Sequence, residues 1–254
     1  MDGIRGNLDG VRNIIRFNWH LYVLPLVLVS LFFLFRSYVN FIAQLLFGSI
    51  LVLTICFTLI SLWVSWYIYD RSDLYKFTWL EEIGMANNDA ILNIHAGFDE
   101  TSVVLKNKLN NAEFLIMDFY DPLKHTEVSI KRARKAYPPN PNVQAINTSS
   151  IPVADNSADK VFTILSAHEI RDRNERIIFF KEIERALNTS GQVIVIEHLR
   201  DAANFVAYNI GFLHFHSRAS WLETFSAAGL LLTKEIKITP FITTFILEKN
   251  GAAN

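Results

Sequence analysis

Two long stretches without charged side chains dominate the N-terminal part of the chain. Residues 17–35 contain no Asp, Glu, Lys or Arg, and after Arg36 the stretch 37–69 contains none either. A helix needs roughly 20 apolar residues to cross the hydrocarbon core of a bilayer, and both stretches meet that need. Aromatic side chains near their ends fit the interfacial belts of membrane proteins. The sequence therefore predicts two transmembrane helices, at about 17–35 and 41–69.

A cleavable signal peptide and two core helices of a soluble protein are the competing interpretations. No small-residue cleavage pattern follows the first stretch, and a longer apolar stretch begins almost at once. A charge-free stretch as long as 37–69 is unusual for a soluble core helix. Pro25 is compatible with a kinked transmembrane helix. Membrane insertion is the interpretation that the pattern favours.

Positive charges lie mainly outside this pair of stretches. Only Arg36 lies between them, whereas the flanking basic residues are Arg5, Arg12, Arg16, Arg71 and Lys76. Because Lys and Arg favour the cytoplasmic side of a membrane, we expect a hairpin with both ends on that side. Residues 1–74 are thus predicted to be a membrane anchor with a short linker. Both termini and the remaining domain are predicted to be cytoplasmic.

Composition narrows the classes of partner and site. The formal net charge of −1 gives no electrostatic support for a nucleic-acid partner. The one cysteine, Cys56, excludes an intrachain disulfide and a cluster of cysteine ligands. The basic segment 131–135 (KRARK) favours a solvated helix face, with contact to anionic headgroups as the minor alternative. We expect no nucleic-acid partner and no metal site, and the sequence leaves protein partners open.

Beyond about residue 70 the pattern becomes that of an α/β domain. Strand and helix patterns alternate, and two strand patterns come together at the end. The predicted strands are 89–95, 113–118, 143–147, 160–166, 192–197, 230–238 and 242–248, and the predicted helices are 101–109, 123–136, 174–187 and 220–228. This order predicts a seven-stranded, mostly parallel, Rossmann-like sheet with a terminal antiparallel hairpin. Ligands of such sheets bind at the carboxyl ends of the strands.

Three segments of this domain carry a family resemblance. Segment 149–170 (SSIPVADNSADKVFTILSAHEI) is similar to an LPFPDNSFDVV…HH motif. Segment 179–198 (FFKEIERALNTSGQVIVIEH) is similar to REIxRVLKPGGxLVIxEH, and DAILNIHAGFDET (89–101) takes the place of a first glycine motif. Residues 89–249 therefore resemble class I S-adenosylmethionine (SAM) dependent methyltransferases, of the small-molecule branch related to ubiquinone and menaquinone methyltransferases. The resemblance implies a methyltransferase domain, at 75–254, with SAM as its cofactor.

The first motif departs from the family pattern D-x-G-x-G-x-G. Asn93 stands at the acid, His95 at the first glycine, Gly97 at the second and Asp99 at the third. Gly97 suits a tight turn with close backbone approach, whereas His95 adds bulk to the cofactor loop. Asp99 or Thr101 is placed to cap the following helix. On these residues alone, an ordinary strand–turn–helix remains the alternative to a cofactor loop.

The resemblance implies further cofactor contacts at the other strand ends. Asp118 ends the second predicted strand, where the family's acid binds the ribose hydroxyls. Asp121 and a helix-capping role for Asp118 are the alternatives. Asn147 and Thr148 lie where the family contacts adenine, and an Asn oxygen can accept a hydrogen bond from the adenine amine. Ser166 begins the segment expected to line the methyl-transfer region.

Three histidines are candidates for acid–base chemistry near neutral pH. His168 lies in the segment that matches the HH motif. His214 and His216 lie before the last predicted helix, in a segment that often covers the acceptor pocket in the family. A hydrogen-bonded structural histidine is the alternative for each one.

The sequence thus predicts a membrane-anchored methyltransferase with a lipophilic acceptor. A tether that restricts an enzyme to a surface is most useful when a quinone-, isoprenoid- or lipid-like acceptor is there too. The alternative is a catalytically inactive, membrane-tethered interaction module whose first motif no longer binds SAM. An NAD-binding Rossmann enzyme is disfavoured, because 95–100 (HAGFDE) lacks the G-x-G-x-x-G pattern.

Overall fold

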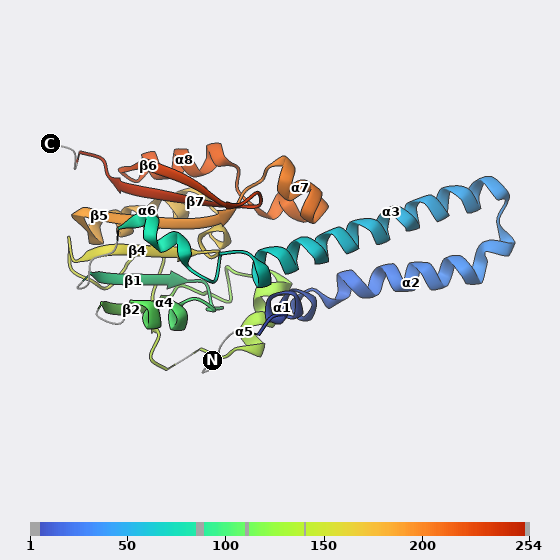
Figure 1. Ribbon diagram of the computed structural model, residues 1–254, viewed down its shortest axis with the longest axis horizontal. Helices are drawn as coiled ribbons and strands as arrows, with labels where there is room; N and C mark the ends of the chain where they lie inside the picture. Colours follow the sequence, from blue (N-terminus) through green and yellow to red (C-terminus); the bar gives the residue numbers. More distant parts are fainter. Residues whose placement is uncertain (1–5, 85–88, 110–111, 140, 252–254) are drawn as a thin grey trace.

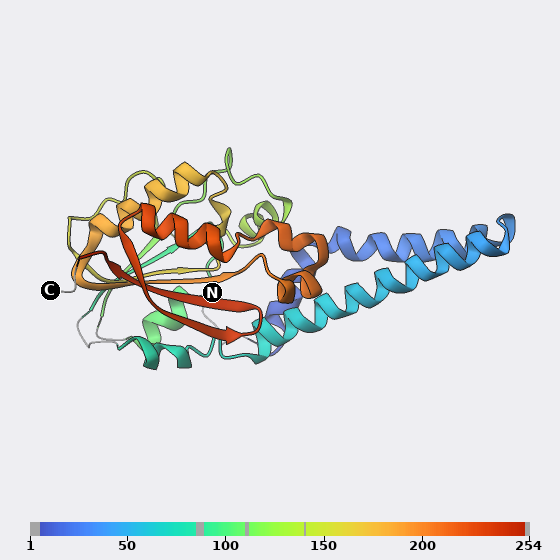
Figure 2. The ribbon, with the colours of Figure 1, turned by 90° about the horizontal axis from the view of Figure 1, so that it is seen from above.

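The structure is a computed structural model that describes residues 6–84, 89–109, 112–139 and 141–251. A hairpin of two apolar helices, α2 (Trp19–Phe35) and α3 (Phe41–Trp66), projects from one end of an α/β domain (Figures 1 and 2). The two termini, which are predicted to be cytoplasmic, lie outside the described residues.

Both helices of the hairpin are long and apolar enough to cross a membrane. The segment Trp19–Tyr38 has a mean hydropathy of 1.9, and Phe41–Arg71 has 2.5. Only 6% of the most apolar part of each segment is buried, whereas a core helix of a soluble protein buries most of its surface. The short connection ends at Asn40, whose Oδ1 accepts a hydrogen bond from the Ala43 amide at 2.9 Å and caps α3.

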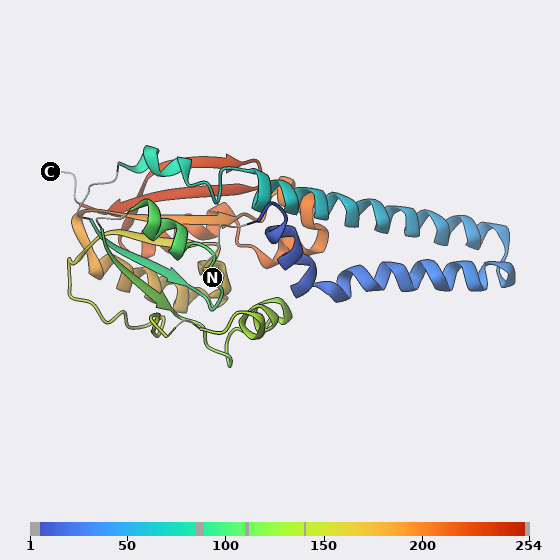
Figure 3. The ribbon, with the colours of Figure 1, turned by 60° about the horizontal axis from the view of Figure 1, so that its bottom comes forward.

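A further helix, α1 (Asp9–Phe17), precedes the hairpin and was not predicted. It lies at the base of the hairpin beside α5 (Val128–Ala136), as Figure 3 shows. The carboxylate of Asp70, in the π-helical turn Tyr67–Arg71 that ends α3, accepts the Gly10 amide at 2.7 Å and the Val11 amide at 2.9 Å. Helix α1 therefore receives its N-terminal cap from a residue that follows α3, at the base of the hairpin.

The central sheet confirms the predicted fold class. Its seven strands have the order β3-β2-β1-β4-β5-β7-β6. Their bounds are β1 Ala90–His95, β2 Glu113–Asp118, β3 Gln144–Ala145, β4 Ala158–Ile164, β5 Leu187–His198, β6 Leu230–Thr239 and β7 Ile242–Lys249. The first five strands pair in parallel, and β7 is antiparallel to both β5 and β6. The carboxyl ends of the parallel strands face the hairpin (Figure 1).

Alternating side chains of the strands bury the two faces of the sheet. Ile94 belongs to the same buried cluster as Phe179 of α6 (Arg173–Ala186) and Trp221 of α8 (Arg218–Ala227). Ile91, three residues earlier in β1, points to the opposite face and belongs to the second buried cluster. That cluster contains side chains from α3, from the 3-10 helix Thr78–Ile83 and from α4 (Ser102–Lys108). The base of the hairpin is therefore part of a hydrophobic core of the domain.

Local side-chain bonds shorten one predicted helix. The helix predicted at 123–136 begins only at Val128. The Asp121 Oδ1 accepts the Leu123 amide, and the His125 Nδ1 accepts the Asp121 amide, each at 2.8 Å. Such side chain–backbone bonds hold a turn in competition with a helix.

Two predicted boundaries around the strands also differ. The third strand is reduced to Gln144–Ala145, and the fifth strand, predicted from residue 192, already begins at Leu187. A Cβ at Gly191 would lie 3.0 Å from the Ala158 carbonyl oxygen, so glycine serves close strand pairing there. The register of β4 and β5 shifts beside Ala158.

The segment after β5 contains two short helices that were not predicted. Helix α7 (Ala202–Tyr208) begins at Asp201, whose side chain accepts the Asn204 amide at 2.9 Å. A 3-10 helix, Asn209–His214, follows it. Helix α7 packs against α3 at the base of the hairpin (Figure 1).

Candidate active site

A large open cavity lies at the carboxyl ends of β1, β4 and β5. Its empty space of about 1040 Å³ includes volume open to solvent. Strand-end residues line one side, and residues from α1, α5 and the base of the hairpin line the other. The lining residues include Asn13 and Phe17 of α1, Tyr69 at the base of the hairpin, and residues of the α/β domain, namely Asn93, His95, Thr101, His168, Glu169, His198 and Phe215. The predicted membrane anchor therefore supplies part of the cavity wall.

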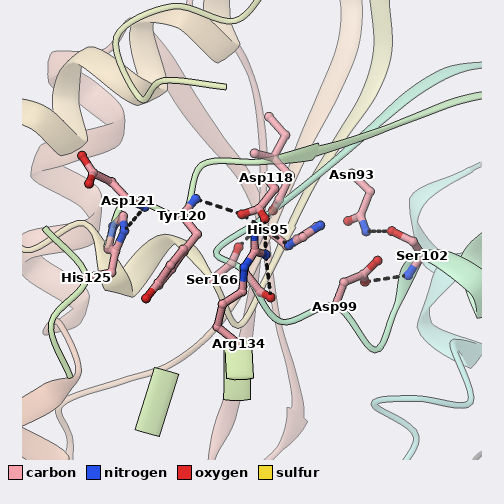
Figure 4. Close-up of polar contacts among 12 residues, drawn as sticks. Asn93, His95, Asp99, Ser102, Asp118, Tyr120, Asp121, His125, Arg134 and Ser166 are labelled. Carbon is pink, nitrogen blue, oxygen red and sulfur yellow. Dashed lines mark hydrogen bonds and ion pairs between the residues drawn. The ribbon is translucent and has the colours of Figure 1, made fainter. Parts of the chain in front are cut away.

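The first loop is held by hydrogen bonds to the start of α4. Asn93 is buried, and its Nδ2 donates to the hydroxyls of Thr101 at 3.1 Å and Ser102 at 2.7 Å. The Asp99 Oδ1 accepts the backbone amides of Thr101 and Ser102, each at 2.9 Å. The expected helix cap is thus confirmed with Asp99 as its side chain, and Figure 4 shows this carboxylate directed toward α4.

Gly97 makes the tight turn that the first motif requires. Its φ is +82°, a conformation that side chains disfavour. A Cβ at this position would lie 2.9 Å from the Tyr120 Cγ, so the loop approaches the end of β2 closely. The first loop therefore makes a tight turn with one glycine, packed against the end of β2.

His95 is buried without a hydrogen-bond partner among the described residues. Both of its ring nitrogens are unpaired, although its Nδ1 lies 3.9 Å from the Asp118 Oδ1. Burial lowers the pKa of His95, against the opposing effect of the nearby carboxylates. The ring is therefore neutral at pH 7, and it offers one donor and one acceptor to the cavity that it lines.

Asp118 lies where predicted, at the end of β2, and its carboxylate is engaged on both sides. Its Oδ1 accepts the Tyr120 amide at 2.8 Å, and its Oδ2 accepts from the Arg134 Nη1 at 2.5 Å. The same Arg134 nitrogen donates to the Gly97 carbonyl oxygen at 3.1 Å. Figure 4 shows the guanidinium between the first loop and the end of β2. Sequence analysis missed Arg134, which projects from the basic segment of α5.

A second, smaller cavity lies beyond the carboxyl end of β2. It has about 500 Å³ of empty space, and its lining includes Tyr120, Asn147 and Thr148. The Asn147 Oδ1 accepts the Ser149 amide, whereas the Thr148 hydroxyl donates to the Glu175 Oε1 at 2.5 Å. The cavity at the predicted adenine residues thus adjoins the residues that follow Asp118, whereas Asp118 itself is buried and lines neither cavity.

Ser166 lies at the end of β4 and joins two strand ends. Its hydroxyl donates to the Ile94 carbonyl oxygen at 3.0 Å. Ser166 is buried and is not among the residues that line either cavity. Its contact in this structure is with the backbone of β1.

His168 forms a buried ion pair that the sequence did not indicate. Its Nδ1 lies 2.6 Å from the Oε2 of Glu197, which is fully buried at the end of β5. The Glu197 Oε1 also accepts the His168 amide at 3.1 Å. Desolvation opposes the charged imidazole, but the Glu197 carboxylate outweighs it and raises the pKa of His168 to about 9. His168 therefore carries a proton at pH 7 and lines the main cavity.

His214 adjoins His168 but is not among the residues that line the cavity. The two rings meet edge to face with centroids 5.1 Å apart. The His214 Nδ1 lies 2.5 Å from the Glu127 Oε1, and its Nε2 lies 3.7 Å from the Glu169 Oε1. The Arg171 guanidinium contacts the same Nδ1, the His214 carbonyl oxygen and Glu127. This cluster brings together residues that are far apart in the sequence.

His216 is placed apart from these two histidines. Its Nε2 lies 3.1 Å from the Nη1 of Arg176, a buried residue that also bonds Thr224 and Ser220. Burial and the Arg176 charge lower the pKa of His216 to about 3. The ring packs on Trp221 and lines neither cavity. Its contacts join α6 to α8 and leave the cavity to other side chains.

His198 lines the main cavity and links the sheet to the hairpin. Its Nε2 lies 2.8 Å from the Tyr69 hydroxyl, and its Nδ1 lies 3.0 Å from the Asn204 Oδ1. Burial lowers the pKa of His198 to about 4, so it is neutral at pH 7. A neutral ring with Nδ1–H toward Asn204 accepts the Tyr69 hydroxyl hydrogen.

Comparison with known proteins supports the same class of domain. Residues 110–195 match a family described as a methyltransferase domain. No curated protein matches the sequence. A crystal structure of a SAM-dependent methyltransferase from Aquifex aeolicus is similar, with 15% identity, 69% of this chain and 89% of that chain covered, and a TM-score of 0.51.

A second solved structure is similar to the same extent. It is the PH0226 protein from Pyrococcus horikoshii, with 15% identity, 67% of this chain and 86% of that chain covered, and a TM-score of 0.50. At this identity, both structures show that the fold is shared. The family match thus covers part of the α/β domain, and the solved structures show its fold.

Proposed function

We propose that this protein is a membrane-anchored methyltransferase that transfers a methyl group from SAM to a lipophilic small molecule. Residues 1–74 form the membrane anchor, residues 75–254 form the methyltransferase domain on the cytoplasmic side, and the acceptor is quinone-, isoprenoid- or lipid-like. The observation that carries the proposal is the main cavity. Its walls combine the strand ends of the sheet with α1 and Tyr69 at the base of an apolar hairpin.

Three features of the first loop and its surroundings fit SAM. Gly97 allows the tight turn of the first loop against Tyr120, and the nitrogens of buried His95, unpaired among the described residues, are available to a polar ligand. Asp118 ends β2 beside Tyr120, and Arg134 joins its carboxylate to Gly97 of the first loop, a position that suits hydrogen bonds from ribose hydroxyls. In the bound state SAM supplies a methyl group already activated on its sulfonium sulfur. The remaining work of the protein is to orient the acceptor and exclude water.

Each predicted cofactor residue has a proposed role that its position supports. Asn93 holds the first loop on α4, while Gly97 shapes it and His95 bonds the ligand. Asp118 binds the ribose after exchanging at least one of its present hydrogen bonds. Asn147 and Thr148 hold the adenine end of the ligand, and Ser166 joins the end of β4 to β1.

The acceptor end of the cavity is assigned to His168 and His214. Because His168 is protonated at pH 7, it is placed to donate a hydrogen bond to the acceptor and not to remove its proton. Glu197 fixes the orientation of this ring through Nδ1. His216 contributes indirectly, by holding Arg176 and Trp221.

Exposed apolar side chains beside the hairpin support the membrane part of the proposal. On α7 and the following 3-10 helix, Phe205 is 48% exposed, Ile210 is 82% and Leu213 is 56%. These elements pack together, and α7 contacts α3. A cluster of such side chains next to two apolar helices fits insertion into a membrane interface. The acceptor then reaches the cavity from the bilayer.

Cofactor binding by the full chain tests the proposal. We expect the protein in detergent or lipid nanodiscs to bind SAM or S-adenosylhomocysteine in the micromolar range by isothermal titration. Asp118→Asn should weaken binding about tenfold or more, because a charge-assisted hydrogen bond contributes roughly 1.5–3 kcal/mol. Asp155→Asn, on an exposed ion pair with Arg185, is the matched control. Absence of binding by both ligands favours the alternative, a catalytically inactive interaction module.

The acceptor class has its own test. Lipid and quinone fractions of membranes with and without the protein are compared by mass spectrometry. The proposal expects one lipophilic species to gain the mass of a methylene group only when the protein is present. A methylated product confined to the water-soluble fraction would contradict a lipophilic acceptor.

A further inference from the structure

His168, Glu169 and His214 bring three metal-ligating groups together at the acceptor end of the cavity. One potential ligand atom from each residue lies within 4.8 Å of the other two. The Glu169 Oε1 is 3.6 Å from the His168 Nε2 and 3.7 Å from the His214 Nε2. Donors at ~2.1 Å from a tetrahedral metal ion lie ~3.4 Å apart, so only small movements separate this arrangement from a coordination sphere.

Both histidines have a carboxylate on the nitrogen that faces away from Glu169. Glu197 lies against the Nδ1 of His168 at 2.6 Å, and Glu127 lies against the Nδ1 of His214 at 2.5 Å. A carboxylate on one ring nitrogen holds the proton there and directs the other nitrogen to a metal ion. For His168 the metal ion displaces the Nε2 proton and takes the place of the hydrogen bond to the acceptor. The cluster thus has three ligand groups and two supporting carboxylates.

Charges around the cluster also favour a cation. Glu127, Glu169 and Glu197 oppose one nearby guanidinium, that of Arg171. Arg171 contacts the Nδ1 side of His214 and not the side that faces Glu169. When the His214 Nε2 binds a metal ion, its Nδ1 carries the ring proton. Arg171 cannot accept that hydrogen bond, so the Nδ1–H donates to Glu127.

We propose that His168, Glu169 and His214 form a binding site for a divalent first-row transition-metal ion such as Zn²⁺. Two imidazoles and a carboxylate suit this class of ion, whereas Mg²⁺ and Ca²⁺ prefer oxygen ligands. Three protein ligands leave at least one coordination position for water or for an oxygen of the acceptor. The sequence predicted no metal site, because no short ligand motif joins His168 and Glu169 to His214.

The site suggests the chemical class of the acceptor, and this step rests on the proposed function. A hydroxyl oxygen bound to the cation has a lowered pKa and loses its proton to water. A lone pair of that oxygen forms the new bond to the methyl carbon. The carbon–sulfur bond breaks with its electron pair going to sulfur, which becomes a neutral thioether. The products are a methyl ether and S-adenosylhomocysteine, so the acceptor is an alcohol or phenol.

Metal titration of the full chain tests the site. Tag-free protein in detergent, stripped with a chelator, is titrated with Zn²⁺ by calorimetry. We expect one ion per chain with micromolar or tighter affinity. We also expect Glu169→Gln and His214→Asn to weaken binding at least tenfold, while Mg²⁺ competes poorly. His20→Asn changes a histidine remote from the cluster and should leave the affinity unchanged. Equal affinity in the wild type and in both cluster variants would overturn the proposal.

A measurement on the unaltered chain covers the case in which a variant fails to fold. With Co²⁺ bound, X-ray absorption should report two imidazole ligands, and their absence overturns the site. SAM binding is measured on the same samples. If metal binds and SAM does not, the proposed methyltransferase function fails and the metal site stands. If SAM binds and the metal does not, only the metal site fails.

Discussion

His95 decides whether the altered first loop can hold SAM. The ring is buried beside Gly97 and lines the main cavity with both nitrogens unpaired among the described residues. An unsatisfied buried polar group costs roughly 1–3 kcal/mol, which a bound polar ligand recovers. The residue that first suggests a damaged motif is thus placed as a ligand contact.

His95→Ala is expected to weaken SAM binding about tenfold, because the variant loses a hydrogen bond of roughly 1.4 kcal/mol. Isothermal titration of the full chain in detergent measures the change, with His20→Ala as a control remote from the cavity. Tighter binding by His95→Ala would mean that the ring obstructs the cofactor and contributes no contact.

His198 makes stability depend on pH in a defined window. Its pKa is about 4 in the folded protein against a usual value of 6.5, so the unfolded chain takes up the proton first as pH falls. Its contribution to stability is complete above pH 6.5 and is lost as pH falls toward 4. The loss amounts to a few kcal/mol, since one pKa unit corresponds to ~1.4 kcal/mol.

Chemical denaturation of the full chain between pH 4 and 7 checks this expectation. The free energy of unfolding should fall toward pH 4 more steeply in the wild type than in His198→Gln, which cannot take up a proton. Parallel pH profiles for the two proteins would show that His198 protonation is not the cause.

At the scale of elements, α1 depends on a contact that spans the hairpin. The residue before α1, Leu8, makes no side-chain cap, and Asp70 supplies the cap from 60 positions along the chain. Buried positions at Gly10, Asn13 and Phe17 follow the spacing of an amphipathic helix. That spacing was the signal in the sequence that could have revealed α1.

Asp70→Ala should release α1 from the base of the hairpin. The loss of an N-cap side chain costs roughly 0.5–2 kcal/mol, so hydrogen exchange in Asp9–Phe17 should become faster by several-fold to about thirtyfold. Hydrogen exchange with mass spectrometry measures this change. Asp73→Ala, which removes an exposed carboxylate near Lys76, serves as the control. Unchanged exchange in α1 would show that apolar packing alone holds it.

The elements that the sequence predicted are those with local signals. The apolar runs of β1 and β2 and the amphipathic α6 are continuous patterns, and Asp118 follows from its place at a strand end. The contacts that complete the site are not local. His168 meets Glu197 across 29 positions, and Tyr69 meets His198 across 129. Such pairs depend on which elements the fold brings together, and no short pattern records them.

At the scale of the whole molecule, the main cavity lies between the carboxyl ends of the strands and the base of the apolar hairpin. The strand ends that line the cavity face the hairpin, and α7, which carries the exposed Phe205, lies at the same end of the domain (Figures 1 and 2). If α2 and α3 cross the bilayer, the cavity lies close to the membrane surface. Entry of a lipophilic acceptor from the bilayer therefore requires that the hairpin span the membrane.

The single cysteine makes this topology testable. Cys56 lies within α3 and is exposed on the hairpin. In intact membranes we expect it to resist a charged maleimide, because lipid covers it, and to react after detergent is added. In a Cys56→Ser background, Ser37→Cys in the hairpin connection should react only from the non-cytoplasmic side. Leu231→Cys on β6, where the native side chain is exposed, should react only from the cytoplasmic side. Spheroplasts and inverted vesicles give access to the two sides separately. Reaction of both engineered cysteines from one side would contradict a hairpin that spans the membrane, and with it the approach of the acceptor from the bilayer.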